Sequence, residues 1–439
     1  MSLHSLKDNL RSRWRVIFGP LSTRDLWATL CSALGLGLLL FSYFLIRPIR
    51  EVHGSRLGAV GMNVLFLYTF VSLLVVTPLW GMLVRVCSKR WLPVVLMTGI
   101  AGSLVLFSKL LQNADPPRWV SISFFVWVSV FNYMMVSLFW SVMVDCFSPT
   151  TSRRTFGIIA AGGSAGAMLG PLSASLLASR LSSSATLLLS AGLFVIVPLF
   201  LLGVPTREAA IDPLAPEPAT SDDSILSGLI ETISTRYLLC IAGYMLLGSV
   251  LGSLLYVHQA AAIQTAIPDE SARRSFFANT DLATNVLTLV FELIVAAPLL
   301  SWGGLRWPLL LLPLIGLVAA PLLTMWPSVY AIAAVLVVRR ATEYGLAKPA
   351  RELLFTVVTR SQKYKAKNFI DTVVARGGDS IGSSFSSLVS ERNWPPVVAL
   401  WIGAPIAVLF GGLGIWLARE QQKRTPNPPV GVQRTLSIH

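Results

Sequence analysis

The segment from Val338 to Gly378 places charged side chains inside stretches that are otherwise apolar enough to cross a lipid bilayer. An ionisable group at that depth costs about 2.5–3.5 kcal/mol on insertion scales, so it is kept where it binds substrate, pairs with another charge or carries a proton. The charged residues of this segment are Arg339, Arg340, Glu343, Lys348, Arg351, Glu352, Asp371 and Arg376. They make the segment the first candidate for a functional site.

Part of this segment predicts a basic stripe on one face of a helix. The residues with helical spacing are Arg340, Tyr344, Lys348 and Arg351. Such a stripe suits an anion, because guanidinium groups bind phosphate bidentately, an ammonium adds a point charge and an aromatic ring can stack on a base. Glu343 lies four residues after Arg339, and Glu352 four after Lys348, so we expect partial neutralisation by these pairs. Pro349 is expected to interrupt the helix beside them.

A second basic group lies in FSYFLIRPIREVHG, which starts at Phe41. Tyr43, Arg47 and Arg50 share a helical face, and Glu51 follows Arg47 by four residues. Two readings are open. The arginines snorkel to the membrane interface, as long basic side chains near helix ends do, or they bind an anionic substrate.

Acidic residues in apolar stretches are the candidates for charge pairing or for carrying a coupling proton. They are Glu51, Asp145, Glu292, Glu352, Asp371 and Asp379, and Asp281 and Asn285 share a helical face with Glu292. We expect no metal or cofactor, because the four histidines have no metal-ligand spacing. No nucleophile is flanked by a plausible base, so the pattern argues against an enzyme.

Composition indicates the elements that must position these residues. The 439-residue chain is 54% hydrophobic and 13% charged, whereas soluble proteins average about 25% charged. Repeated apolar runs of about 20 residues predict an all-α membrane protein with twelve transmembrane helices. The predicted spans are 26–46, 59–84, 91–111, 119–146, 155–180, 184–203, 237–262, 279–300, 307–325, 328–357, 369–389 and 396–418.

Basic residues gather before the first predicted span and in the loops after the second, fourth, tenth and twelfth, which predicts that both termini are cytoplasmic. The net charge of +14 is then explained by topology, without nucleic-acid binding. Arg47, Arg50 and Arg56 fall at the opposite, non-cytoplasmic end. Because the positive-inside rule disfavours arginines there, an anionic substrate would offset that cost.

The chain reads as two similar halves. A proline-rich stretch after Val204 predicts a linker at 204–236 between six-helix bundles at 1–203 and 237–418, followed by a flexible cytoplasmic tail at 419–439. Arg90-Trp91 in the first half corresponds to Arg306-Trp307 in the second. A parallel duplication of six helices is the plan of the major facilitator architecture, whose substrate site lies between the halves near the midplane. Gly162, Gly166 and Gly170 are spaced for close helix packing.

The stretches FSYFLIRPIRE, FNYMMVSLFWSVMVD and RRATEYGLAKPARELLFTVVTRSQKYKAKNFIDTVV resemble the nucleotide transporters of intracellular bacteria and plastids, the ATP/ADP translocase group. The resemblance implies exchange of nucleotides across a bacterial inner membrane by alternating access, without hydrolysis. The residues that match the family's basic motifs are Arg47, Arg50, Lys348, Arg351, Glu352, Lys367 and Asp371. The chain departs from the family's ATP/ADP exchangers in the fourth predicted span, which offers no acid before Asp145.

The leading prediction is therefore an alternating-access transporter, acting as a monomer, that exchanges a nucleotide or a related phosphorylated anion. A proton-coupled carrier of another organic anion or lipid-like solute is the first alternative. A membrane scaffold or sensor that kept the fold without transport is the second.

Overall fold

The computed structural model describes residues 22–86, 91–112, 116–147, 149–204 and 225–424, and the regular elements in them are helices. Ten helices among these residues are long and apolar enough to cross a membrane. The predicted class, an all-helical membrane protein, is confirmed at this level. Two further helical stretches, at 329–357 and 360–391, coincide with the predicted tenth and eleventh spans but are charged and interrupted. The count of twelve spans stays a prediction.

The chain divides into two compact units. The described parts of the first unit lie within Met1–Leu57, Val71–Ala215 and Ile263–Asn285. Its complete helices are α2 (Thr23–Ser55), α4 (Leu92–Leu110), α5 (Arg118–Cys146), α6 (Pro149–Leu177) and α7 (Ser183–Leu202). It also takes the later part of α3 (Gly58–Val86), the end of α9 (Arg236–Ala266) and the beginning of α10 (Glu270–Val290).

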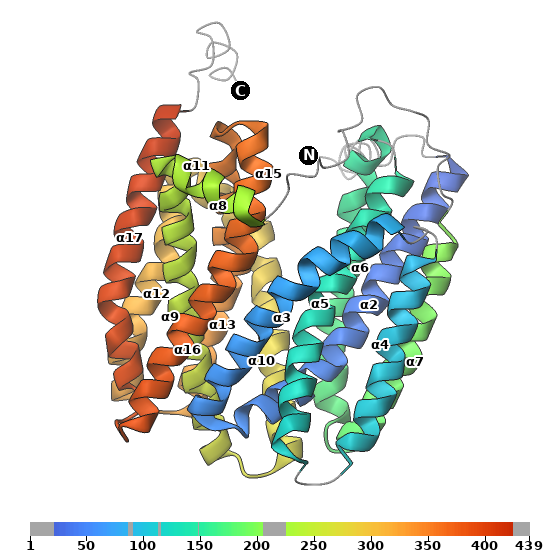
Figure 1. The fold of residues 1–439 in the computed structure, drawn as a ribbon, viewed down its shortest axis with the longest axis horizontal. Helices are drawn as coiled ribbons and strands as arrows, with labels where there is room; N and C mark the ends of the chain where they lie inside the picture. Colours follow the sequence, from blue (N-terminus) through green and yellow to red (C-terminus); the bar gives the residue numbers. More distant parts are fainter. Residues whose placement is uncertain (1–21, 87–90, 113–115, 148, 205–224, 425–439) are drawn as a thin grey trace, which may run out of the picture. The chain divides into compact units, whose positions relative to one another are not determined.

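Helix α2 is central to the first unit and packs against α5, α6 and α7 (Figure 1). The glycine stripe of α6 makes its close approach possible. A Cβ at Gly162 or Gly166 would collide with the α2 backbone at Ala33 or Gly37, and one at Gly170 would lie 2.7 Å from the Cβ of Phe44. The predicted packing role of these glycines is confirmed.

The described parts of the second unit lie within Gly58–Phe70, Pro216–Ala262 and Val286–His439. Besides its parts of α3, α9 and α10, it holds α8 (Ile225–Ser234), η1 (Phe291–Val295), α11 (Ala296–Gly303), α12 (Arg306–Met325), α13 (Val329–Thr342), η2 (Glu343–Ala347), α14 (Lys348–Leu354), η3 (Phe355–Val357), α15 (Arg360–Phe369), η4 (Ile370–Val374), α16 (Ala375–Glu391) and α17 (Val398–Arg424). Helix α12 packs against α13 and α17 (Figure 1), around a core that includes Tyr237, Leu309 and Phe410.

Three π-turns, η1, η2 and η4, break the regular α-helix in the second unit. Pro349 follows η2 closely, and its missing N–H cannot bond the carbonyl of Gly345. The predicted interruption of this helix is therefore present, in the form of a π-turn. Such turns occur often at functional sites, because they insert a residue and re-aim the side chains that follow.

The two units differ from two continuous halves, since the first includes 263–285 and the second includes 58–70. The bundles predicted at 1–203 and 237–418 stay a prediction. Most of the predicted linker, at 205–224, lies outside the described residues, and the linker ends in the short helix α8. Helix α17 continues to Arg424, so the predicted tail is helical at its start, and 425–439 lie outside the described residues.

Candidate functional site

In the first unit, two arginines of α2 form a buried charge cluster with two carboxylates. Arg47 lies 3.6 Å from Glu51, one turn later in α2, and 3.3 Å from Asp281 of α10. Arg50 forms a very close ion pair with Glu51. The exposed side-chain fractions are 17% for Arg47, 11% for Arg50, 6% for Glu51 and 4% for Asp281. The sequence prediction therefore placed Arg47, Arg50 and Glu51 together, and the structure adds Asp281.

Neighbouring helices fix the positions of these charges. Arg50 donates to the Ser129 hydroxyl of α5 at 3.2 Å and lies 4.8 Å from the ring centre of Phe125. On the other side, Asn285 of α10 donates to the carbonyl of Ala167 in α6 at 2.5 Å, which ties the helix that carries Asp281 to the rest of the unit. Pro48, between the two arginines, removes one backbone hydrogen bond of α2 there.

Tyr43 is 5% exposed and packs edge-to-face against Phe44 and Phe131 in the apolar core of the first unit. The sequence places Tyr43 on the same helical face as Arg47 and Arg50, where its ring could stack on the base of a nucleotide. In this structure its ring is covered by these phenylalanines, so stacking on a base would require the ring to become uncovered.

In the second unit, Arg339 and Arg351 border the same small cavity. Arg339 contacts Glu343 at 3.1 Å and donates to the carbonyl of Gly248 at 2.8 Å. Arg351 lies 3.5 Å from Asp371 and contacts the sulfur of Met245 at 2.7 Å. The cavity has a volume of about 20 Å³, which suits a single water and is too small for an organic anion.

The predicted basic stripe is divided by the π-turn η2. Arg339, Glu343, Ala347 and Arg351 all line the cavity although they are spaced by four residues. In a regular α-helix each such step would rotate the side chain by about 40°, and three steps by about 120°. The wider π-turn takes up this rotation. Spacing predicted from an uninterrupted helix therefore grouped Arg351 with the wrong neighbour, and Arg339 shares its face instead.

The other members of the predicted stripe point elsewhere. The guanidinium of Arg340 lies 5.5 Å from the ring centre of Tyr256 in α9, and that ring packs edge-to-face on Phe66 of α3. Tyr344 is 46% exposed. Lys348 is also exposed and interacts electrostatically with Glu292 of η1.

Three of the predicted acidic residues of the second unit, Glu352, Asp371 and Asp379, form ion pairs with basic residues. Glu352 contacts Lys367 at 2.6 Å, so its partner is not Lys348 as the i, i+4 spacing predicted. Asp379 contacts Arg376 at 3.1 Å. In the first unit, Asp145 is an exposed residue near the end of α5.

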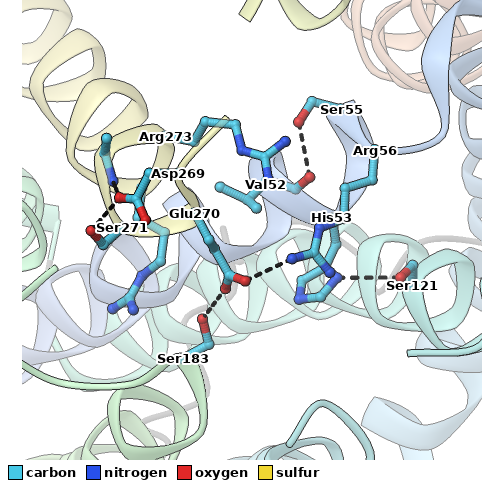
Figure 2. Close-up of polar contacts among 12 residues, drawn as sticks. Val52, His53, Ser55, Arg56, Ser121, Ser183, Asp269, Glu270, Ser271 and Arg273 are labelled. Carbon is cyan, nitrogen blue, oxygen red and sulfur yellow. Dashed lines mark hydrogen bonds and ion pairs between the residues drawn. The ribbon is translucent and has the colours of Figure 1, made fainter. Parts of the chain in front are cut away.

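Sequence reasoning missed one polar group of the first unit, which we call the Glu270 cluster: His53, Arg56, Ser121, Ser183 and Glu270 (Figure 2). Glu270 contacts Arg56 at 2.6 Å and accepts from the Ser183 hydroxyl at 2.7 Å. His53, 2% exposed, lies 3.2 Å from the Ser121 hydroxyl. The signal was the acidic pair Asp269-Glu270 before Ser271, which is typical of a helix start.

Asp269 directly precedes α10, and hydrogen bonds from the first turn of that helix stabilise its ionised carboxylate. The Ser271 hydroxyl and the backbone N–H of Ala272 donate to it at 2.5 and 2.7 Å. These hydrogen bonds, that from Ser271 first, lower the pKa of Asp269.

Arg47 and Arg351 lie farther from their carboxylates than the partners of a charge-assisted hydrogen bond usually do. Charge-assisted N–H···O contacts measure about 2.7–2.9 Å, whereas the carboxylates of Arg47 lie at 3.3 and 3.6 Å and that of Arg351 at 3.5 Å. The Nε of each is buried without a hydrogen-bond partner among the described residues. No group of three or more metal-ligating side chains occurs in the described residues.

Comparison with solved structures identifies the fold. A bacterial homologue of the human lysosomal transporter Spinster, inward-facing and occupied, has a TM-score of 0.65 at 12% identity, over 93% of this chain and 100% of that one. The nucleoside transporter NupG has a TM-score of 0.57 at 15% identity, over 93% and 100%. The POT family transporter PepTSo has a TM-score of 0.63 at 13% identity, over 92% and 100%.

The chain therefore shares its overall helical fold with these solved transporters. No family model matches the chain, and no curated protein matches its sequence. The resemblance to nucleotide transporters stays a prediction that rests on the motifs themselves.

Proposed function

We propose that this protein is an alternating-access transporter of a nucleotide or a related phosphorylated anion, and that it works by exchange in a bacterial inner membrane. Twelve spans with both termini cytoplasmic are part of the proposal. The fold supports transport, and the basic motifs of α2 and of 338–378 support an anionic substrate. The nucleoside described for NupG is a property of that protein, and a nucleoside lacks the phosphate of a nucleotide, so the inference of an anionic substrate rests on the basic motifs alone.

The observation that carries the proposal is the buried cluster of Arg47, Arg50, Glu51 and Asp281. Two buried cations balanced by two carboxylates form a neutral group that is tolerated inside a bundle. Because the Arg47 contacts are long, a phosphate can replace a carboxylate at that guanidinium with shorter, bidentate hydrogen bonds. The cluster then changes its net charge when substrate binds.

The second unit repeats this arrangement with Arg351 and Asp371. Their contact is also long, at 3.5 Å. A phosphate does not fit the cavity of about 20 Å³ at Arg351, so binding there requires the side chains around Met245 to move. Conformational change coupled to binding is what alternating access needs.

The carrier exchanges one anion for another if its charge clusters allow the change between inward-facing and outward-facing states only when an anion is bound. The test is uptake of labelled ATP by purified protein in liposomes preloaded with ATP, with ADP or with buffer alone. We expect preloading with a nucleotide to increase the initial rate at least tenfold. Equal uptake into loaded and empty vesicles would reject exchange, and absence of any nucleotide uptake would reject the substrate class.

One observation favours proton coupling as the second candidate. Asp379 lies close enough to Glu343 for repulsion between the two carboxylates, with Arg376 and Arg339 beside them. Two neighbouring carboxylates can share a proton. Uptake into empty vesicles driven by an inward proton gradient, without an internal nucleotide, would select this candidate.

A further inference from the structure

A cleft of about 440 Å³ lies at one end of the first unit, where the turn after α2 approaches the beginning of α5. Small-molecule sites have volumes of about 300–1,000 Å³, so the cleft is large enough for a phosphate-bearing group. It is lined by Arg56, Leu57, Pro116, Pro117, Arg118 and Ser121. Neither the predicted binding site nor the cluster around Arg47 uses these residues.

Within the Glu270 cluster, the carboxylate of Glu270 holds Arg56 in place (Figure 2). Glu270 contacts its Nη2 at 2.6 Å and is itself fixed by the hydroxyl of Ser183. A guanidinium has five N–H donors in a rigid fork, so one that is anchored to a carboxylate can still serve a second acceptor. Ser121 also lines the cleft, and its hydroxyl lies 3.2 Å from Nδ1 of His53.

The surroundings of Arg56 carry more positive than negative charge. Arg273 and Arg274 of α10 are 5% and 4% exposed. Arg273 donates to the amide oxygen of Gln264, and its Nε is buried without an acceptor among the described residues. Arg274 donates to the carbonyl of Leu181 at 2.9 Å and to the hydroxyl of Thr186 at 3.0 Å. These acceptors are neutral, so an anion at this end of the unit would reduce an electrostatic cost.

Arg118 is the second basic residue that lines the cleft. It is the first residue of α5, it is exposed, and the first turn of that helix has neither an acidic residue nor a side chain that caps it. The positive end of the helix dipole therefore adds to the charge of Arg118 and Arg56, and no carboxylate in the first turn of α5 opposes it.

We propose that this cleft binds a phosphate group through Arg56, Arg118 and the Ser121 hydroxyl. The phosphate belongs either to the solute or to a phospholipid headgroup, since both present the same oxygens. Arg50 lies about 9 Å along the helix from Arg56. A phosphate-bearing solute bound in the cleft could therefore move directly to the cluster at Arg47 and Arg50. That capture role rests on the proposed function, whereas phosphate binding itself does not.

The direct test is calorimetric titration of the purified protein with inorganic pyrophosphate in a non-ionic detergent at low salt. The matched variants are Arg118→Gln and Arg180→Gln, because Arg180 is an exposed arginine of the same unit in the turn after α6. We expect Arg118→Gln to weaken binding about tenfold or more, as loss of one charge-assisted contact does, and Arg180→Gln to bind like the wild type. Equal affinities in the two variants, or no binding by the wild type, overturn the proposal.

Arg47→Gln separates this site from the proposed substrate site. We expect it to retain the binding event that Arg118→Gln weakens, and loss of all pyrophosphate binding in Arg47→Gln would show that the cleft is not an independent site. Nanodiscs of phosphatidylcholine with and without phosphatidylglycerol distinguish whether the bound phosphate belongs to a solute or to a phospholipid headgroup. Weaker pyrophosphate binding with the anionic lipid, in the wild type only, identifies a headgroup as the occupant. Unchanged binding identifies a solute.

Labelled ATP uptake gives the transport readout. We expect Arg118→Gln to raise the apparent KM about tenfold at low ionic strength while Vmax stays within about twofold, because capture and not translocation is weakened. If the wild type binds pyrophosphate at the cleft but takes up no nucleotide, the proposed function fails and the cleft stands. If it takes up nucleotide and Arg118→Gln changes neither binding nor KM, the cleft fails and the proposed function stands.

Discussion

At the scale of single residues, the carboxylates of Glu51 and Asp281 offset the free-energy cost of burying the charge of Arg47. Replacing it by glutamine leaves Glu51 and Asp281 with Arg50 as their remaining cation in the cluster. Breaking a buried ion pair from one side destabilises by about 3–5 kcal/mol, because an uncompensated charge stays buried. We expect Arg47→Gln to lower the melting temperature in detergent and to abolish nucleotide exchange.

The double variant Arg47→Gln/Asp281→Asn separates stability from binding. It removes one charge of each sign, so the melting temperature should return most of the way to the wild-type value while exchange stays absent. Recovery of exchange in the double variant would show that Arg47 only neutralises Asp281. A wild-type melting temperature in the single variant would show that these long contacts contribute little to stability.

Asp379 decides between exchange and proton coupling. It lies in α16 beside Arg376 and close to Glu343, and neutralising it removes the carboxylate best placed to share a proton. If exchange is correct, Asp379→Asn should leave uptake into ATP-loaded liposomes within about twofold of the wild type at external pH values from 5.5 to 8. Loss of a pH dependence that the wild type shows would favour the proton-coupled carrier. Ser380→Ala, one position further along, serves as the control for the substitution itself.

Local pairs were predictable from the sequence and distant ones were not. The i, i+4 spacing correctly predicted Arg47 with Glu51 and Arg339 with Glu343, because the helix alone brings such residues together. The contact of Arg47 with Asp281 joins α2 to α10, and nothing local indicates it. The same is true of Glu352, which contacts Lys367 across a helix break.

At the scale of elements, the π-turns determine which side chains share a face. Periodicity located the helix around Arg339 but could not show that η2 changes its register, since a π-turn needs no special composition. The turns also pack together. A Cβ at Gly345 in η2 would lie 2.9 Å from the Cβ of Phe291 in η1 and 3.0 Å from the carbonyl oxygen of Thr288. Only glycine allows this approach without a shift of α10 and η1.

Gly345→Ala tests this packing. We expect it to destabilise the protein by about 1–3 kcal/mol, as overpacking does, and to reduce uptake because the register around Arg339 and Arg351 changes. Gly377→Ala is the matched control, since it is also helical and a Cβ there meets nothing within 4 Å. That change should raise the melting temperature slightly or leave it unchanged, because alanine favours a helix by about 0.5–1 kcal/mol over glycine. Equal effects of both substitutions would contradict the close packing of η1 and η2.

At the scale of the whole molecule, hydropathy located the long helices because apolar length is a strong local signal. Each predicted span coincides with a helical stretch, from α2 to α17, and the predicted glycine packing of α6 on α2 is present. The division into compact units was not predictable in the same way. Residues 58–70 and 263–285 belong to units other than those of their sequence neighbours, which follows from long-range packing rather than from local composition.

The stretches at 329–357 and 360–391 are the critical case for the topology, because their charges exclude them from the ten apolar spans. If the predicted spans within them, 328–357 and 369–389, both cross the bilayer, the charged segment that joins these spans is cytoplasmic and the turn after α16 is not. If neither crosses, both positions lie on the same, non-cytoplasmic side. Lys365 and Arg392 mark these two positions.

Single cysteines in a cysteine-free background, labelled with a membrane-impermeant maleimide, therefore count these spans. In intact spheroplasts we expect Arg392→Cys to react and Lys365→Cys to react only after permeabilisation, because a charged stretch can span when its charges face the bundle interior and are paired. Arg180→Cys should behave like the accessible position and Lys423→Cys like the protected one, which controls for reagent access on each side. Labelling of Lys365→Cys in intact spheroplasts would remove the twelve-span topology, and with it the placement of Arg351 and Asp371 within the membrane.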